Sequence, residues 1–78
     1  MMTRVLLFAA VRDAFGVGAI ELDVATVADA QRELTGRCPA AAGILARSRF
    51  AVNAQFVDSA YRLREGDEIA VIPPVSGG

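Results

Sequence analysis

The chain has 78 residues, of which 54% are hydrophobic and 22% charged, with a formal net charge of −1. We expect one domain over residues 1–78. A domain of this size has little room for a substrate cavity, so we do not expect a self-contained enzyme. It has no His and one Cys, which excludes a Cys/His zinc site, an internal disulfide and His-dependent catalysis; its eight basic residues are all Arg, and without Lys it cannot form a Schiff base. We therefore expect no bound metal and no permanently bound cofactor. The charge balance argues against a nucleic-acid partner, and the absence of a long apolar stretch or a signal-peptide pattern argues against a membrane, so we expect a cytoplasmic protein.

The first part of the chain reads as a β-hairpin. Residues 3–9 form an almost unbroken apolar run, the pattern of a strand covered on both sides, and we expect a central strand there. Gly16 and Gly18 then mark a turn. Residues 19–24 alternate apolar with acidic side chains, which predicts an edge strand with one wet face.

A helix that covers the sheet is predicted next. Thr26 suits the N-cap position, and Asp29 stands where the acid of a capping box belongs. The apolar positions of this segment that share one helical face are Val27, Ala30 and Leu34. Gly36 is placed to end the helix as a C-cap, and residues 40–46 predict a second short helical segment.

Strand character returns in the second half of the chain. Residues 49–57 are interrupted by a turn at Asn53, and Gly66 predicts a tight turn with positive φ that delivers the chain into residues 69–72. That last strand is apolar throughout. Two uninterrupted apolar strands, residues 3–9 and 69–72, are best placed side by side in the middle of one sheet, where parallel pairing is tolerated.

The chain then ends in the tail Pro73-Pro74-Val75-Ser76-Gly77-Gly78. The two prolines remove backbone donors and should stop sheet pairing, and the terminal glycines are slim enough for a narrow channel. The four residues after Pro74 can extend about 13 to 14 Å. We therefore predict a flexible arm over residues 73–78 whose carboxyl end carries the chemistry; the plain alternative is a frayed chain terminus.

Three segments carry a resemblance to a known family. They are Phe8-Ala9-Ala10-Val11-Arg12 after the first strand, Ala51-Val52-Asn53 in the third, and residues 66–78 with their Pro-Pro-Val-Ser-Gly-Gly end. With the order strand, strand, helix, strand, strand, the chain resembles the β-grasp, ubiquitin-like fold, and over its whole length it resembles the small subunit of molybdopterin synthase, the MoaD family. The resemblance implies an α+β fold with a mixed sheet of about five strands and one main covering helix.

The resemblance also implies a function. An ATP-dependent, E1-like activating enzyme (MoeB-like) would adenylate the Gly78 carboxylate, and a sulfur-donor enzyme would convert it to a thiocarboxylate. The tail, with Gly77 preceding the reactive residue, would then enter the large synthase subunit (MoaE-like). There the sulfur would build the dithiolene of molybdopterin from cyclic pyranopterin monophosphate. The chain is thus expected to be a non-catalytic, sulfur-carrying subunit, with ATP used only by the activating partner.

By the same resemblance, one face of the domain docks these partners. The residues implied in partner binding are Phe8, Arg12, Ile72, Pro73, Pro74, Val75 and Ser76. The residues alone leave two questions open. Phe8 and Ile72 could equally be core, because strand alternation cannot be resolved in a run that is apolar throughout. Arg12 could be a solvated loop residue or a contact to a partner.

Other functions fit the same features. A sulfur carrier of another pathway, such as the ThiS-like thiazole or the cysteine-biosynthesis type, would share the fold, although those tails usually lack the Pro-Pro pair. A ubiquitin-like modifier would use the same activation chemistry to form isopeptide bonds. A non-catalytic interaction domain would be indifferent to the loss of Gly77 and Gly78.

Overall fold

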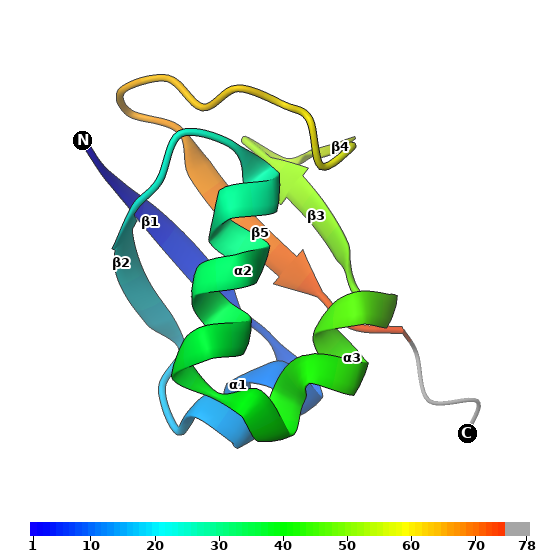
Figure 1. Cartoon of the computed structure of the whole chain (residues 1–78). Helices are drawn as coiled ribbons and strands as arrows, with labels where there is room; N and C mark the ends of the chain where they lie inside the picture. Colours follow the sequence, from blue (N-terminus) through cyan, green and yellow to red (C-terminus); the bar gives the residue numbers. More distant parts are fainter. Residues whose placement is uncertain (75–78) are drawn as a thin grey trace.

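The computed structural model describes residues 1–74, which form one mixed sheet in the order β2-β1-β5-β3-β4 with helices packed on it (Figure 1). The strands are β1 (Met2–Leu7), β2 (Ala19–Asp23), β3 (Arg49–Val52), β4 (Gln55–Val57) and β5 (Glu68–Ile72); the helices are α1 (Ala9–Phe15), α2 (Val27–Arg37), the 3-10 helix η1 (Pro39–Ala41) and α3 (Ala42–Arg47). The predicted α+β architecture of about five strands and one main covering helix is confirmed. No helix within residues 1–74 is long and apolar enough to cross a membrane.

The two uninterrupted apolar strands are the centre of the sheet. β1 and β5 pair in parallel, with Val5 opposite Ile69 and Leu7 opposite Val71, and these four side chains are at most 1% exposed. β2 pairs antiparallel with β1 at one edge, and β3 and β4 complete the other side. The predicted central pairing and the edge hairpin are therefore confirmed. The expectation of a strand covered on both sides holds for its edges only, because burial alternates along β1 and β5 and their other face carries the exposed pair Arg4 and Glu68.

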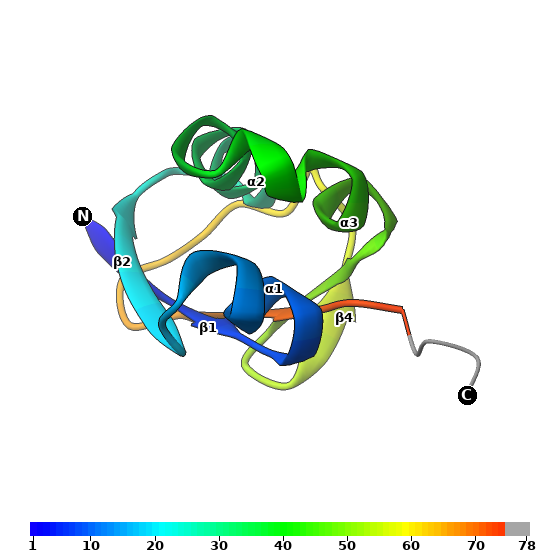
Figure 2. The same cartoon turned by 90° about the horizontal axis from the view of Figure 1, so that it is seen from below.

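The main core lies between this sheet and α2, which with α3 covers one side of it (Figure 2). The helix residues predicted to share one face, Val27, Ala30 and Leu34, are all buried. The capping box is present: the Asp29 N–H donates to Thr26 Oγ1 over 3.1 Å, and the Thr26 N–H donates to Asp29 Oδ2 over 3.2 Å. Partial desolvation of the Asp29 carboxyl raises its pKa, but the hydrogen bonds from Ala25 and Thr26 outweigh this and the pKa is lowered.

The predicted C-cap at Gly36 is wrong. The helix continues through Arg37, and Cys38 caps it by donating its N–H to the Leu34 carbonyl over 3.0 Å. Cys38 precedes a proline, which disfavours the helical region for its own backbone, and it adopts φ −139° and ψ 80°. Pro39 therefore sets the end of the helix, and Gly36 stays inside it.

The end of the first apolar run also differs from the prediction of a strand over residues 3–9. The strand stops at Leu7, Phe8 is extended, and Ala9 has φ +49° at the start of α1. This short helix was not predicted. It ends where Gly16, at φ +76°, donates its N–H to the Arg12 carbonyl over 2.8 Å, so the glycine supplies the left-handed conformation that ends the helix.

A side-chain network fixes the turn that leads into β5. Asn53 Nδ2 donates to Asp67 Oδ1 over 2.9 Å, and the Arg64 N–H donates to Asp67 Oδ2 over 2.8 Å. Asn53 Oδ1 accepts from the Glu68 N–H over 3.0 Å. The hydrogen bond from Arg64 and that from Asn53 together lower the pKa of the Asp67 carboxyl. Gly66 has the predicted positive φ, +88°, and β5 is thereby anchored at its first residue.

Candidate functional site

The site is built around the end of β5, the strand that carries the tail. β5 lies between β1 and β3 and stops at Ile72, as the two prolines predict. Pro73 is buried against the body of the domain and Pro74 is exposed. Gly77 and Gly78, on which the chemistry was predicted, and Val75 and Ser76, implied in partner binding, lie outside the described residues, so their roles remain predictions.

Beside this exit lies a groove of about 750 Å³, lined by Phe8, Ala9, Ala10, Ile44, Arg47, Ile72, Pro73 and Pro74. We call it the exit groove. Four of the residues implied in partner binding, Phe8, Ile72, Pro73 and Pro74, meet in it. They converge because β1 and β5 run in parallel, which brings the C-terminal ends of both strands to the same end of the sheet.

The structure places Phe8 and Ile72 at the surface and not in the core. Phe8 is 45% exposed and Ile72 36% exposed. Ile72 points away from the helices because side chains alternate along β5, where Ile69 and Val71 already face the core. Phe8 lies one residue beyond β1, at the extended link into α1. By contrast, Phe50 is 7% exposed and belongs to the core.

Ile72 also borders the face of the sheet that is left uncovered by the helices of residues 1–74. On that face the register brings Arg49 opposite Ile72 and Phe56 opposite Ala51. Phe56 is 53% exposed, and the Arg49 guanidinium lies 3.7 Å from the centre of its ring. The sequence analysis did not identify Phe56. The sequence feature that could have identified it is an aromatic residue at the middle of a short edge strand, because the side chain there faces one side of the sheet.

Arg12, the other residue implied in docking, does not line the exit groove. Its side chain is exposed on α1 and lies along the turn before β2, where a Cβ added to Gly18 would be 3.5 Å from Arg12 Nε. Arg12 lies one helical turn beyond Phe8, whose carbonyl accepts the Arg12 N–H over 3.2 Å, but Arg12 is not among the residues that line the groove.

The lining of the exit groove limits what the domain can do chemically. Among residues 1–74, Arg47 is its only charged side chain, and none of these lining residues carries a carboxylate, thiol or imidazole. The two carboxyls with lowered pKa values, Asp29 and Asp67, stabilise a helix start and a turn elsewhere. This lining suits the docking of another protein, and it offers no general acid or base.

The sequence was compared with protein families and characterised relatives. Residues 5–78 match the ThiS family. A molybdopterin synthase sulfur carrier subunit of Dictyostelium discoideum is 37% identical, with 96% of this chain and 94% of that protein covered. The protein of the same description from Chlamydomonas reinhardtii is 36% identical, with both chains covered over their full length.

Solved structures agree in fold. The crystal structure of small archaeal modifier protein 1 from Haloferax volcanii superposes with a TM-score of 0.86 at 29% identity, with both chains fully covered. A putative molybdopterin converting factor subunit 1 from Pyrococcus furiosus has a TM-score of 0.84 at 28% identity over 96% of this chain and 99% of that one. A complex of subunits 1 and 2 of molybdopterin-converting factor from Helicobacter pylori contains a chain with a TM-score of 0.74 at 23% identity, both fully covered, which shows the fold alone. The predicted β-grasp fold is confirmed, and this chain belongs to the ThiS family and, within it, to the molybdopterin synthase sulfur carrier subunits, the MoaD family.

Proposed function

We propose that this chain is the sulfur carrier subunit of a molybdopterin synthase, with Gly78 as the residue that carries sulfur. The observation that carries the proposal is the match of the whole chain, tail included, to relatives described as molybdopterin synthase sulfur carrier subunits. The exit groove supports it, because the domain places an exposed apolar surface directly beside the strand that bears the tail.

The chemistry follows from the weakness of a carboxylate as an acyl donor. A Gly78 carboxylate oxygen attacks the α-phosphorus of ATP on the activating enzyme, and pyrophosphate leaves. A hydrosulfide equivalent from the sulfur donor then attacks the acyl carbon, and AMP leaves, so that a thiocarboxylate remains. A dithiolene contains two sulfur atoms and each tail carries one, so two loaded chains are consumed for each molybdopterin. Acid and base groups come from the partner proteins.

Three partners follow from this scheme: an E1-like adenylating enzyme, a sulfur donor and the large synthase subunit. The relatives at 36–37% identity, which are described as subunits of molybdopterin synthase, support the last of these. The docking surface for the large subunit is the exit groove together with Phe56 and Ile72 on the uncovered sheet face. Exposed aromatic and aliphatic side chains that meet in one place are typical of interface anchors.

Mass spectrometry of the intact chain tests the proposal. The chain is incubated with the activating enzyme, ATP and a sulfur source, and replacement of one carboxylate oxygen by sulfur raises the mass by about 16 Da. A chain that lacks Gly77 and Gly78 serves as the control and should gain nothing. An unchanged mass of the full-length chain under conditions that load a known carrier would contradict the proposal.

A second candidate, a ubiquitin-like protein modifier, is favoured by one observation, the full-length superposition on small archaeal modifier protein 1 at 29% identity. Both functions begin with adenylation of the terminal glycine, so the product decides between them. A modifier becomes attached through Gly78 to lysines of other proteins. Because Arg64 is the last basic residue of the chain, tryptic peptide mapping detects this linkage as a lysine that carries residues 65–78 as a branched remnant. The carrier yields the thiocarboxylate and no such remnant.

A further inference from the structure

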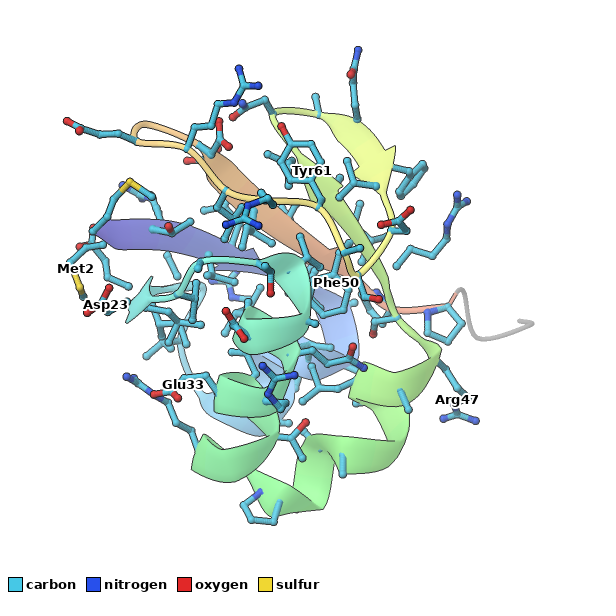
Figure 3. All side chains as sticks on the ribbon, turned by 45° about the horizontal axis from the view of Figure 1, so that its top comes forward. Met2, Asp23, Glu33, Arg47, Phe50 and Tyr61 are labelled. Atoms are coloured by element: carbon cyan, nitrogen blue, oxygen red, sulfur yellow. The ribbon has the colours of Figure 1, made fainter. Side chains whose placement is uncertain are left out.

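One charged residue, Arg47, lies in the otherwise apolar lining of the exit groove. Arg47 is the last residue of α3, and its side chain extends from the end of that helix on the side of the molecule where the chain leaves β5 (Figure 3). It is exposed, and within residues 1–74 it forms no ion pair and no hydrogen bond. An arginine in this state is available to a partner.

Four other arginines are engaged within the domain, whereas Arg12, Arg62 and Arg64 form no side-chain ion pair among residues 1–74. Arg4 pairs with Glu68 at 3.7 Å, and Arg32 and Arg37 pair with acids of their own helix. Arg49, also at the tail end of the sheet, stacks on the Phe56 ring at 3.7 Å. Within residues 1–74 Arg47 has no comparable contact, and it is the charged residue that lines the exit groove.

Geometry requires the exit groove to be covered when the tail is used. Pro73 and Pro74 line the groove, and the four residues that follow Pro74 reach at most about 14 Å. A protein that encloses the acyl group of Gly78 must therefore bring its own surface close to Pro74. Arg47 then loses much of its contact with water.

Removing a guanidinium from water without a neighbouring anion is unfavourable, so we expect the covering surface to supply a negative charge. Arginine presents a planar fork of donors that matches a carboxylate in two parallel hydrogen bonds. A phosphate on the substrate is the less suitable anion, since the reacting acyl group is separated from Arg47 by the length of the tail. The anion should belong to the protein that lies over the groove.

We propose that Arg47 is a docking residue that pairs with an Asp or Glu side chain of the large synthase subunit, next to an apolar side chain of that subunit that fills the groove between Phe8, Ile44 and Pro74. The inference rests on the proposed function. It assigns Arg47 a role in positioning the tail: the ion pair fixes the orientation of the domain, so that the tail points into the partner's active site. The groove supplies contact area, and the ion pair fixes the orientation of the domain on the large subunit.

The test compares Arg47→Glu with Arg64→Glu, a reversal of the same charge at an exposed arginine in the loop before β5, at the opposite end of that strand. The dissociation constant for the purified large subunit of the same organism is measured by calorimetry at low and high salt. Arg47→Glu should weaken binding by about 30-fold or more and flatten the salt dependence, while Arg64→Glu should bind like the wild type. Arg47→Met, which keeps an apolar stem of similar length, should weaken binding by a smaller factor.

Charge exchange identifies the partner residue. Replacing the matching acid of the large subunit by arginine should restore binding to Arg47→Glu and weaken binding to the wild type. A dissociation constant for both Arg47→Glu and Arg47→Met within about twofold of the wild type would overturn the inference. So would unchanged binding with a raised KM for cyclic pyranopterin monophosphate, because Arg47 would then contact substrate.

The failure of the proposed function is recognised separately. A wild-type chain that binds the large subunit but never yields molybdopterin contradicts the proposed function, whereas the Arg47 variants still decide the docking contact. A wild-type chain that does not bind the large subunit at all contradicts both.

Discussion

Phe8 gives the sharpest test of the exit groove as a docking surface. A phenylalanine side chain presents about 200 Å², and since Phe8 is 45% exposed, about 90 Å² is available for a partner to cover. At about 25 cal/mol per Å² this area contributes about 2 kcal/mol to binding. Phe8→Ala should therefore raise the dissociation constant for the large subunit by about 10- to 30-fold, because the alanine retains part of the contact.

The control for this variant is Val17→Ser. Val17 is 47% exposed in the loop between α1 and β2 and does not line the groove, so its replacement should leave binding unchanged. Binding is measured by calorimetry, and thermal unfolding of the same samples verifies that both variants are folded at the titration temperature. If Phe8→Ala bound within about twofold of the wild type, or if Val17→Ser weakened binding equally, the groove would not be the docking surface.

Three further predictions concern the turns and the tail. Ala54→Gly should stabilise the chain by about 1 kcal/mol, because Ala54 has φ +70° in the β3–β4 turn and a Cβ is disfavoured there; an unchanged urea midpoint would contradict the strain. Asp67→Asn should destabilise the chain at neutral pH and flatten its acid dependence: the folded pKa of Asp67 is lowered from 3.8, so its contribution is complete above that value and is lost as the pH falls through the lowered pKa. An equal loss of unfolding free energy in the wild type and in Asp67→Asn on acidification would contradict this prediction. One residue added beyond Gly78 should abolish sulfur transfer without altering thermal unfolding, because the acyl group shifts by about 3.5 Å; normal transfer by the unprocessed extension would refute a fixed-length channel.

Much of the fold could be predicted from the sequence because its strongest patterns are each compatible with one structure. The two most continuous apolar runs, which became β1 and β5, predicted a pair of strands at the centre of the sheet, and these strands lie there. Thr26 and Asp29 carry a complete capping box, so the start of α2 could be located to the residue. The C-cap predicted at Gly36 was wrong because Pro39, three residues later, ends the helix.

The candidate site was harder to derive, because exposure depends on neighbours that the local sequence does not contain. The side of the sheet that Ile72 faces is fixed by its register with Arg49 and by the burial of Val71, and a uniformly apolar run carries no period from which to infer it. α1 was missed because its N-cap residue, Phe8, has no capping side chain. Arg47 gave no signal of its own; only the fold brings it beside Pro74.

The most direct test of the central claim is a single-turnover transfer experiment with the loaded chain. Thiocarboxylated chain, the large subunit and cyclic pyranopterin monophosphate are mixed without ATP, and molybdopterin and the mass of the chain are followed together. If Gly78 carries the sulfur, one molybdopterin should form for every two chains that return to the carboxylate mass. Molybdopterin formed without loss of sulfur from the chain, or sulfur lost without molybdopterin, would contradict the account.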